Sequence, residues 1–204
     1  MRLSRVTLAF SVLVFSLVVA SPSFANTVSM EYFSNKPVNV NGVPTVLACE
    51  SYDNTVYNGE TWTANVSPLL QGIATSLYGP SMTLDYKAAG LIFKAVLFGG
   101  GNPNATTAQW AIWGLFSANA REQSGFTAAA AALDAQYLAI ASTAKNSAFN
   151  GLLLYTAIPG SQSIGGTPQE FIGYSPVPEP SSLMLMGTGL IGLAGTIRRK
   201  LAKV

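Results

Sequence analysis

Two residues of this chain, Cys49 and Gln109, have side chains that together could form a reactive bond. Cys49 is the chain's single cysteine, so it is either an inert buried side chain or a reactive group. Gln109 lies in a segment with helical periodicity, where Ile112 and Trp113 follow at i+3 and i+4 on the same face. A buried amide on such an apolar face needs hydrogen-bond partners, because leaving it unpaired costs roughly 1–3 kcal/mol.

The chemistry open to such a pair is the formation of an internal thioester. A side-chain carboxamide held against a cysteine can lose ammonia and leave a stored acyl electrophile, which an amine or hydroxyl group of another molecule can attack. The alternative is a glutamine that caps backbone groups between a strand and a helix. Both interpretations require the fold to bring Gln109 to the segment of Cys49, so the elements that carry the two residues come next.

The first third of the body has the composition of β structure, with β-branched residues between turn residues. Residues 43–49 predict a buried strand that carries Cys49 at its end. The dipeptide Asn58-Gly59 predicts a hairpin turn between segments 55–57 and 61–66.

The pattern becomes helical after Pro68. A short helix is expected at 69–77, and longer helices are expected at 85–98, at 106–119 with Thr106 or Thr107 as its cap, and at 127–149. Strands are expected again at 152–158 and 169–174. This order predicts an α+β fold, with a β-rich N-terminal part, a three-helix middle and C-terminal strands.

Two segments of the body resemble bacterial thioester domains, which are surface adhesin modules. Residues 109–113, Gln-Trp-Ala-Ile-Trp, are similar to the family's Gln-x-Ala-Ile-Trp helix motif, and the run that ends at Cys49 is similar to its upstream cysteine segment. The chain departs from the family where Ala48 and Ala108 replace an aromatic residue and a threonine. The resemblance implies a thioester-domain-like fold and a Cys49–Gln109 crosslink.

The N-terminus predicts a secretory signal peptide at residues 1–25. Two arginines precede a long apolar run, and small residues ahead of the expected cut predict cleavage after Ala25. An uncleaved N-terminal anchor is the alternative. We therefore expect export by the Sec machinery and an exported α+β domain at 26–175.

The C-terminus predicts a membrane-spanning tail. Residues 181–197 are 17 residues without a charge, and as a helix they would reach about 25 Å, the short end of what crosses a bilayer. Residues 198–204 are basic and are expected to stay cytoplasmic. A rigid turn at 176–180 separates this tail from the body. The residues expected to act in sorting are Pro178, Glu179, Pro180, Arg198, Arg199 and Lys200.

The Pro-Glu-Pro turn, the apolar span and the Arg-Arg end closely resemble the PEP-CTERM sorting signal. This resemblance implies recognition and processing by an exosortase. It also implies a Gram-negative, exopolysaccharide-producing source, with an inner-membrane-anchored precursor and a product at the cell surface or in the extracellular matrix. A plain C-terminal anchor is the alternative.

Composition excludes several classes of function. Six of the 11 basic residues lie in the two ends, so the body keeps five against eight acidic residues, a net charge of −3. Such a body has no basic patch for nucleic acid. Histidine is absent, which excludes Ser-His-Asp triads and the usual zinc sites. We expect no catalytic residue, metal or cofactor, and a protein that is not an enzyme.

The sequence thus predicts an exported structural or adhesive protein of the cell envelope or biofilm matrix, with a Cys49–Gln109 thioester as the sharper hypothesis. Its partners would then be surface amines or hydroxyls. The alternative is noncovalent binding of exopolysaccharide, which requires an exposed Trp62 or Trp110 as a stacking platform.

Overall fold

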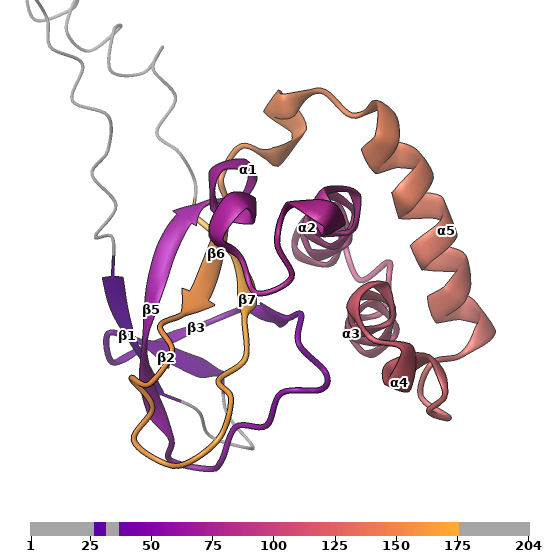
Figure 1. The fold of residues 1–204 in the computed structure, drawn as a ribbon. Coiled ribbons are helices and arrows are strands. Elements are labelled where there is room, and N and C mark those ends of the chain that lie inside the picture. Colours follow the sequence, from indigo (N-terminus) through magenta and orange to yellow (C-terminus); the bar gives the residue numbers. More distant parts are fainter. Residues whose placement is uncertain (1–26, 32–36, 176–204) are drawn as a thin grey trace, which may run out of the picture.

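The computed structural model describes residues 27–31 and 37–175, which fold into one antiparallel sheet with helices packed on one of its faces (Figure 1). The strand order is β3-β2-β1-β5-β6-β7-β4. The strands are β1 Thr27–Glu31, β2 Val38–Val40, β3 Val43–Thr45, β4 Ala48–Cys49, β5 Thr61–Pro68, β6 Leu152–Ala157 and β7 Phe171–Tyr174. The α+β class predicted from the sequence is confirmed.

The sheet is curled, as the positions of β3 and β4 require. These strands form opposite edges of the sheet, yet only Val46 and Leu47 separate them in the chain. Three residue steps span at most roughly 11 Å, so the two edges must approach each other. The prediction of one buried strand at 43–49 is therefore wrong: Val43 and Val46 are 62% and 63% exposed, and only the β4 end is buried.

The hairpin predicted around Asn58-Gly59 is also wrong. The turn itself exists, since the Glu60 N–H donates to the Tyr57 carbonyl (2.9 Å) and Gly59 has a φ of 79°. Segment 55–57 is not a strand, however, because β5 pairs with β1 on one side and with β6 on the other. Both edges of β5 are thus occupied by strands far from it in the chain, β1 upstream and β6 downstream.

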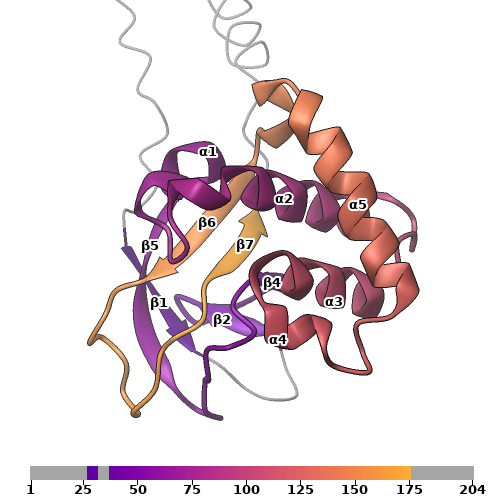
Figure 2. The same ribbon diagram turned by 45° about the vertical axis from the view of Figure 1, so that its right-hand side comes forward.

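Of the three long helices, α2 and α3 lie next to the sheet, and α5 packs over them on the side away from the sheet (Figure 2). The α-helices are α1 Leu69–Gly72, α2 Thr83–Phe98, α3 Ala105–Phe116, α4 Ala118–Arg121 and α5 Ala128–Thr143, with 3₁₀ turns η1 Ile73–Thr75, η2 Pro80–Met82 and η3 Asn146–Phe149. Asn104, not Thr106 or Thr107, caps α3, because its side chain accepts from the N–H groups of both threonines. The predicted helix at 127–149 ends earlier, at Thr143, and a 3₁₀ turn follows.

The alternation of side chains along the strands creates two cores, one on each face of the sheet. Leu152 and Leu154 of β6 pack toward the helices, in a cluster with buried residues of α2, α3 and α5. Leu153 and Tyr155 point to the other face, inside the curl, where Trp62 and Cys49 are buried with them. Cys49 is thus held between the helix layer and the inside of the curl.

No helix within the described ranges is long and apolar enough to cross a membrane. The predicted signal peptide at 1–25, the turn at 176–180, the span at 181–197 and the tail at 198–204 lie outside those ranges.

Candidate functional site

The structure brings Gln109 against Cys49, 60 positions earlier in the chain. The Gln109 amide Nε2 donates to the Cys49 carbonyl (2.6 Å), and the Cys49 N–H donates to Gln109 Oε1 (3.3 Å). Figure 2 shows the strand of Cys49, β4, beside α3. One carboxamide therefore satisfies both backbone groups of one cysteine.

The register of β4 explains why Cys49 has these groups to offer. Cys49 lies opposite Phe171 in the antiparallel pair with β7, and the next residue, Glu50, donates its N–H to the Glu170 carbonyl (3.0 Å). Neighbouring residues of an edge strand direct their backbone groups alternately toward the partner strand and away from it. The groups of Cys49 point away from β7, to the open edge of the sheet, where Gln109 lies.

Helix α3 positions Gln109 through its own packing. Its Asn104 cap fixes the start of the helix, and Ala108, Ala111 and Ile112 are buried in the core against α2, α5 and the sheet. These contacts leave Gln109 partly buried at the sheet edge. The sequence argument for an inward-facing amide thus identified the right face of the helix.

The Cys49 thiol is buried and protonated at neutral pH. Burial raises its pKa to about 12, while the indole of Trp113 and the backbone of Ser51 act in the opposite direction. Its Sγ lies 3.9 Å from the Ser51 carbonyl oxygen. A thiol in this environment does not ionise freely, so its reactivity depends on the groups that immediately surround it.

Three aromatic side chains cluster next to the Cys49–Gln109 pair. The ring centroid of Tyr52 lies 5.8 Å from that of Trp110 and 5.3 Å from that of Trp113, and the two indoles are 5.0 Å apart. They follow Cys49 by three residues and Gln109 by one and four residues, respectively. Sequence reasoning missed Tyr52, although an aromatic residue so close to the cysteine was a usable signal.

Trp62 cannot serve as a sugar platform. It is 2% exposed and stacks on Phe171 inside the curl, with ring centroids 6.1 Å apart. Trp110, by contrast, is only partly buried. The alternative function loses one of its two proposed residues.

A second polar cluster lies on the helix-facing side of the β4–β7 pair, and sequence reasoning did not identify it. Glu170 is 1% exposed, and its carboxylate accepts hydrogen bonds from Thr156 Oγ1 (2.6 Å), the Leu77 N–H (3.0 Å) and the Tyr86 hydroxyl. Glu50 is fully buried, and neither of its carboxyl oxygens has a hydrogen-bond partner. Burial and then the charge of Glu170 raise the pKa of Glu50 well above its usual range.

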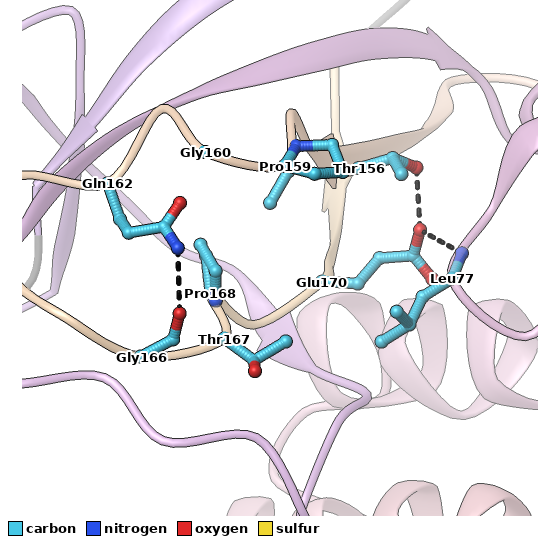
Figure 3. Close-up of a pocket in the computed structure, with 10 residues that line it drawn as sticks. Leu77, Thr156, Pro159, Gly160, Gln162, Gly166, Thr167, Pro168 and Glu170 are labelled. Carbon is cyan, nitrogen blue, oxygen red and sulfur yellow. Dashed lines mark hydrogen bonds between the residues drawn. The ribbon is translucent and has the colours of Figure 1, made fainter.

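Glu170 also lies at one end of a pocket of about 240 Å³ (Figure 3). Pro159, Gln162 and Pro168 line it together with Thr156. The Gln162 amide Nε2 donates to the Gly166 carbonyl (2.8 Å), whereas its Oε1 is buried without a partner. Among the described residues no group of three metal-binding side chains occurs.

Comparison with known protein families finds one match, at the C-terminus. Residues 176–200 match the PEP-CTERM protein-sorting motif. This chain carries a PEP-CTERM sorting signal. The signal implies an exported protein that is anchored at the membrane before an exosortase processes it. No curated protein and no solved structure matches the chain significantly.

The PEP-CTERM match includes all six residues that we expected to act in sorting, from Pro178 to Lys200. Ala25, the expected signal cleavage site, lies outside the described residues. The comparisons give no support to the resemblance between the body and thioester domains. What the body does must therefore be inferred from the geometry of Cys49 and Gln109.

Proposed function

We propose that this exosortase-sorted protein is a structural or adhesive protein that attaches covalently to its partner through a thioester between Cys49 and Gln109. The observation that carries the proposal is the two-point bonding of the Gln109 carboxamide to Cys49. The product of sorting is delivered to the cell surface or extracellular matrix of a Gram-negative bacterium. It acts once per molecule and is not an enzyme.

The proposed bond needs no further reactant. The Cys49 sulfur attacks the side-chain carbonyl carbon of Gln109, the C–S bond forms and the C–N bond breaks. The thiol proton leaves with the amide nitrogen as ammonia. A surface amine or hydroxyl then attacks the same carbon, takes the acyl group and returns a proton to the sulfur. Attachment therefore leaves a free thiol behind.

Three features of the site support this chemistry. The carboxamide is fixed beside the Cys49 backbone by two hydrogen bonds, which removes much of the entropy cost of reaction. The thiol is buried, which protects a thioester from hydrolysis. The aromatic side chains of Tyr52, Trp110 and Trp113 pack on one another next to the pair.

The test is the intact mass of the protein recovered from the envelope of the producing cell. We expect a deficit of one ammonia relative to the sequence of the processed chain, and this deficit should be absent from Cys49→Ala and Gln109→Ala. Methylamine should add its own mass to the ammonia-deficient form, which converts Gln109 to an N-methylamide and frees the Cys49 thiol. Gln123→Ala, which removes an exposed amide bonded only to the Asn119 carbonyl, is the matched control and should keep the deficit.

The contrary result is an unmodified mass together with a thiol that titrates stoichiometrically after mild unfolding. That result would leave Gln109 as a backbone cap, the arrangement that its hydrogen bonds already permit. It would end the thioester proposal but not the assignment of the sorting signal.

A second candidate function is noncovalent binding of exopolysaccharide, and the pocket beside Glu170 favours it. The unpartnered Oε1 of Gln162 and the hydroxyls of Thr156 and Thr167 suit the hydroxyl donors of a single sugar ring between two prolines. Binding of the cell's own polysaccharide should then survive Cys49→Ala and weaken in Gln162→Ala. Equal binding by Gln162→Ala and the wild type would exclude the pocket.

A further inference from the structure

The indole N–H of Trp113 is a buried donor without an acceptor. Its Nε1 has no hydrogen-bond partner among the described atoms, although it is shielded from water. Leaving a buried donor unpaired costs stability, so native proteins rarely keep one without a reason. Indole nitrogen only donates, so the missing partner must be an acceptor.

The position of Trp113 indicates which acceptor that is. Trp113 follows Gln109 by four residues and lies on the same face of α3. Its ring packs against the core inside the curl, which includes Cys49. The indole already opposes the effect of burial on the pKa of the thiol, although its N–H makes no hydrogen bond of ordinary length and angle. Within the core against which Trp113 packs, the Cys49 sulfur is the group that gains acceptor strength when it becomes negatively charged.

We propose that the indole N–H of Trp113 donates a hydrogen bond to the Cys49 sulfur whenever that sulfur carries negative charge during formation and opening of the thioester. This inference rests on the function proposed above. It makes Trp113 a catalytic residue for the single turnover, because its N–H contacts a reacting atom.

The charge on sulfur accounts for this role. When the thioester forms, the thiol gives up its proton to the departing ammonia, and the sulfur is most negative as it approaches the Gln109 carbon. When an amine opens the thioester, the C–S bond breaks, the sulfur leaves as a thiolate, and the proton lost by the amine ends on it. A fixed donor in a water-excluded site stabilises that charge in both directions.

Trp62 provides a matched control within the same core. Its indole Nε1 is also buried and unpartnered, and it too packs in the cluster with Cys49. It stacks on Phe171 and is not among the groups that act on the Cys49 thiol. Trp62→Phe and Trp113→Phe thus remove the same atoms from the same core, but only the second removes the proposed donor.

The experiment uses the exported protein and methylamine as the nucleophile. We expect Trp113→Phe to contain less thioester than the wild type at a given time after export. We also expect methylamine to open its thioester at least about tenfold more slowly, the effect of losing a buried hydrogen bond to a charged atom. Trp62→Phe should open at the wild-type rate. Equal rates for the two variants would overturn the role of Trp113.

A second measurement covers the case in which Trp113→Phe does not fold. In the otherwise wild-type protein labelled with ¹⁵N, opening by methylamine should shift the indole N–H resonance of Trp113 more than that of Trp62. Equal shifts would overturn the inference. A wild-type protein without the ammonia deficit would overturn the thioester and the role of Trp113 together, whereas a formed thioester with unaffected kinetics would overturn only the latter.

Discussion

Glu50 lies directly across from Glu170 on neighbouring antiparallel segments, and both carboxyl groups are buried. The register Ala48↔Ile172 and Cys49↔Phe171 continues to this pair, and the Glu50 N–H donates to the Glu170 carbonyl (3.0 Å). Like charges directly opposite each other in a sheet are destabilising. Glu170 has three hydrogen-bond donors and Glu50 has none, so Glu50 is the group that stays neutral.

Glu50→Gln should therefore become more stable relative to the wild type as the pH rises. The folded-state pKa of Glu50 lies well above its unfolded value of about 4.3, so the folded protein binds the extra proton. The contribution of Glu50 to wild-type stability is fully present below about pH 4.3. It is lost as the pH rises from there through the folded pKa, by up to about 1.4 kcal/mol per pH unit. Urea denaturation at a series of pH values measures the difference. The exposed Glu122→Gln is the control. The same dependence of unfolding free energy on pH in the wild type, Glu50→Gln and Glu122→Gln would contradict the prediction.

Asp134 should produce a similar loss in a defined window. It is 5% exposed, and burial raises its pKa to about 7, although Arg121 Nη2 at 3.6 Å lowers it. Stability should fall between about pH 3.9, its usual unfolded value, and about pH 7. Asp134→Asn should flatten that part of the profile, and Arg121→Gln should extend the loss to higher pH. If Arg121→Gln left the window unchanged, the exposed guanidinium would have no effect on Asp134.

Gln109 should stabilise the fold even when no thioester can form. In a Cys49→Ala background the backbone groups at position 49 remain, so Gln109→Ala removes only two hydrogen bonds from them. We expect a loss of about 1–3 kcal/mol in the free energy of unfolding, because a buried N–H and C=O are left unpaired. Gln123→Ala in the same background should cost about 0.5 kcal/mol or less, as for most surface changes. Similar losses for the two variants would show that water replaces Gln109 at the sheet edge.

Gly125→Ala should disturb the aromatic cluster around the site. A Cβ at this position would lie 2.0 Å from Cε2 of Trp110, so the indole must move. We expect a loss of about 1–3 kcal/mol from overpacking and a change in tryptophan fluorescence. Gly165→Ala is the matched control, since nothing lies within 4 Å of a Cβ there. Unchanged fluorescence in Gly125→Ala would mean that the loop, and not Trp110, gives way.

Replacing the tripeptide Pro178-Glu179-Pro180 by alanines should abolish processing by exosortase, because these residues lie in the matched sorting motif. Immunoblots of cell fractions should then show the unprocessed chain in the membrane, as in a strain without the exosortase. Normal processing of the triple-alanine variant would show that the apolar span and basic end suffice for recognition.

The sequence by itself determined the features that depend on neighbouring residues. The sorting signal is a contiguous stretch, read directly from its prolines, apolar span and basic end. The long helices and the strands β6 and β7 follow from local periodicity and turn residues, so they were placed to within a few residues at most ends. The helix face of Gln109 was also predictable, because i+3 and i+4 spacing is local geometry.

Only the tertiary structure decided which strands meet. The run 43–49 reads as one strand, but its two ends belong to opposite edges of the sheet, and the Asn58-Gly59 turn closes a loop because β5 is paired on both sides. The opposition of Glu50 and Glu170, the burial of Trp62 and the unpaired N–H of Trp113 depend on the same pairings. Strand partners are chosen by contacts between residues far apart in the chain, and local sequence patterns carry little information about those contacts.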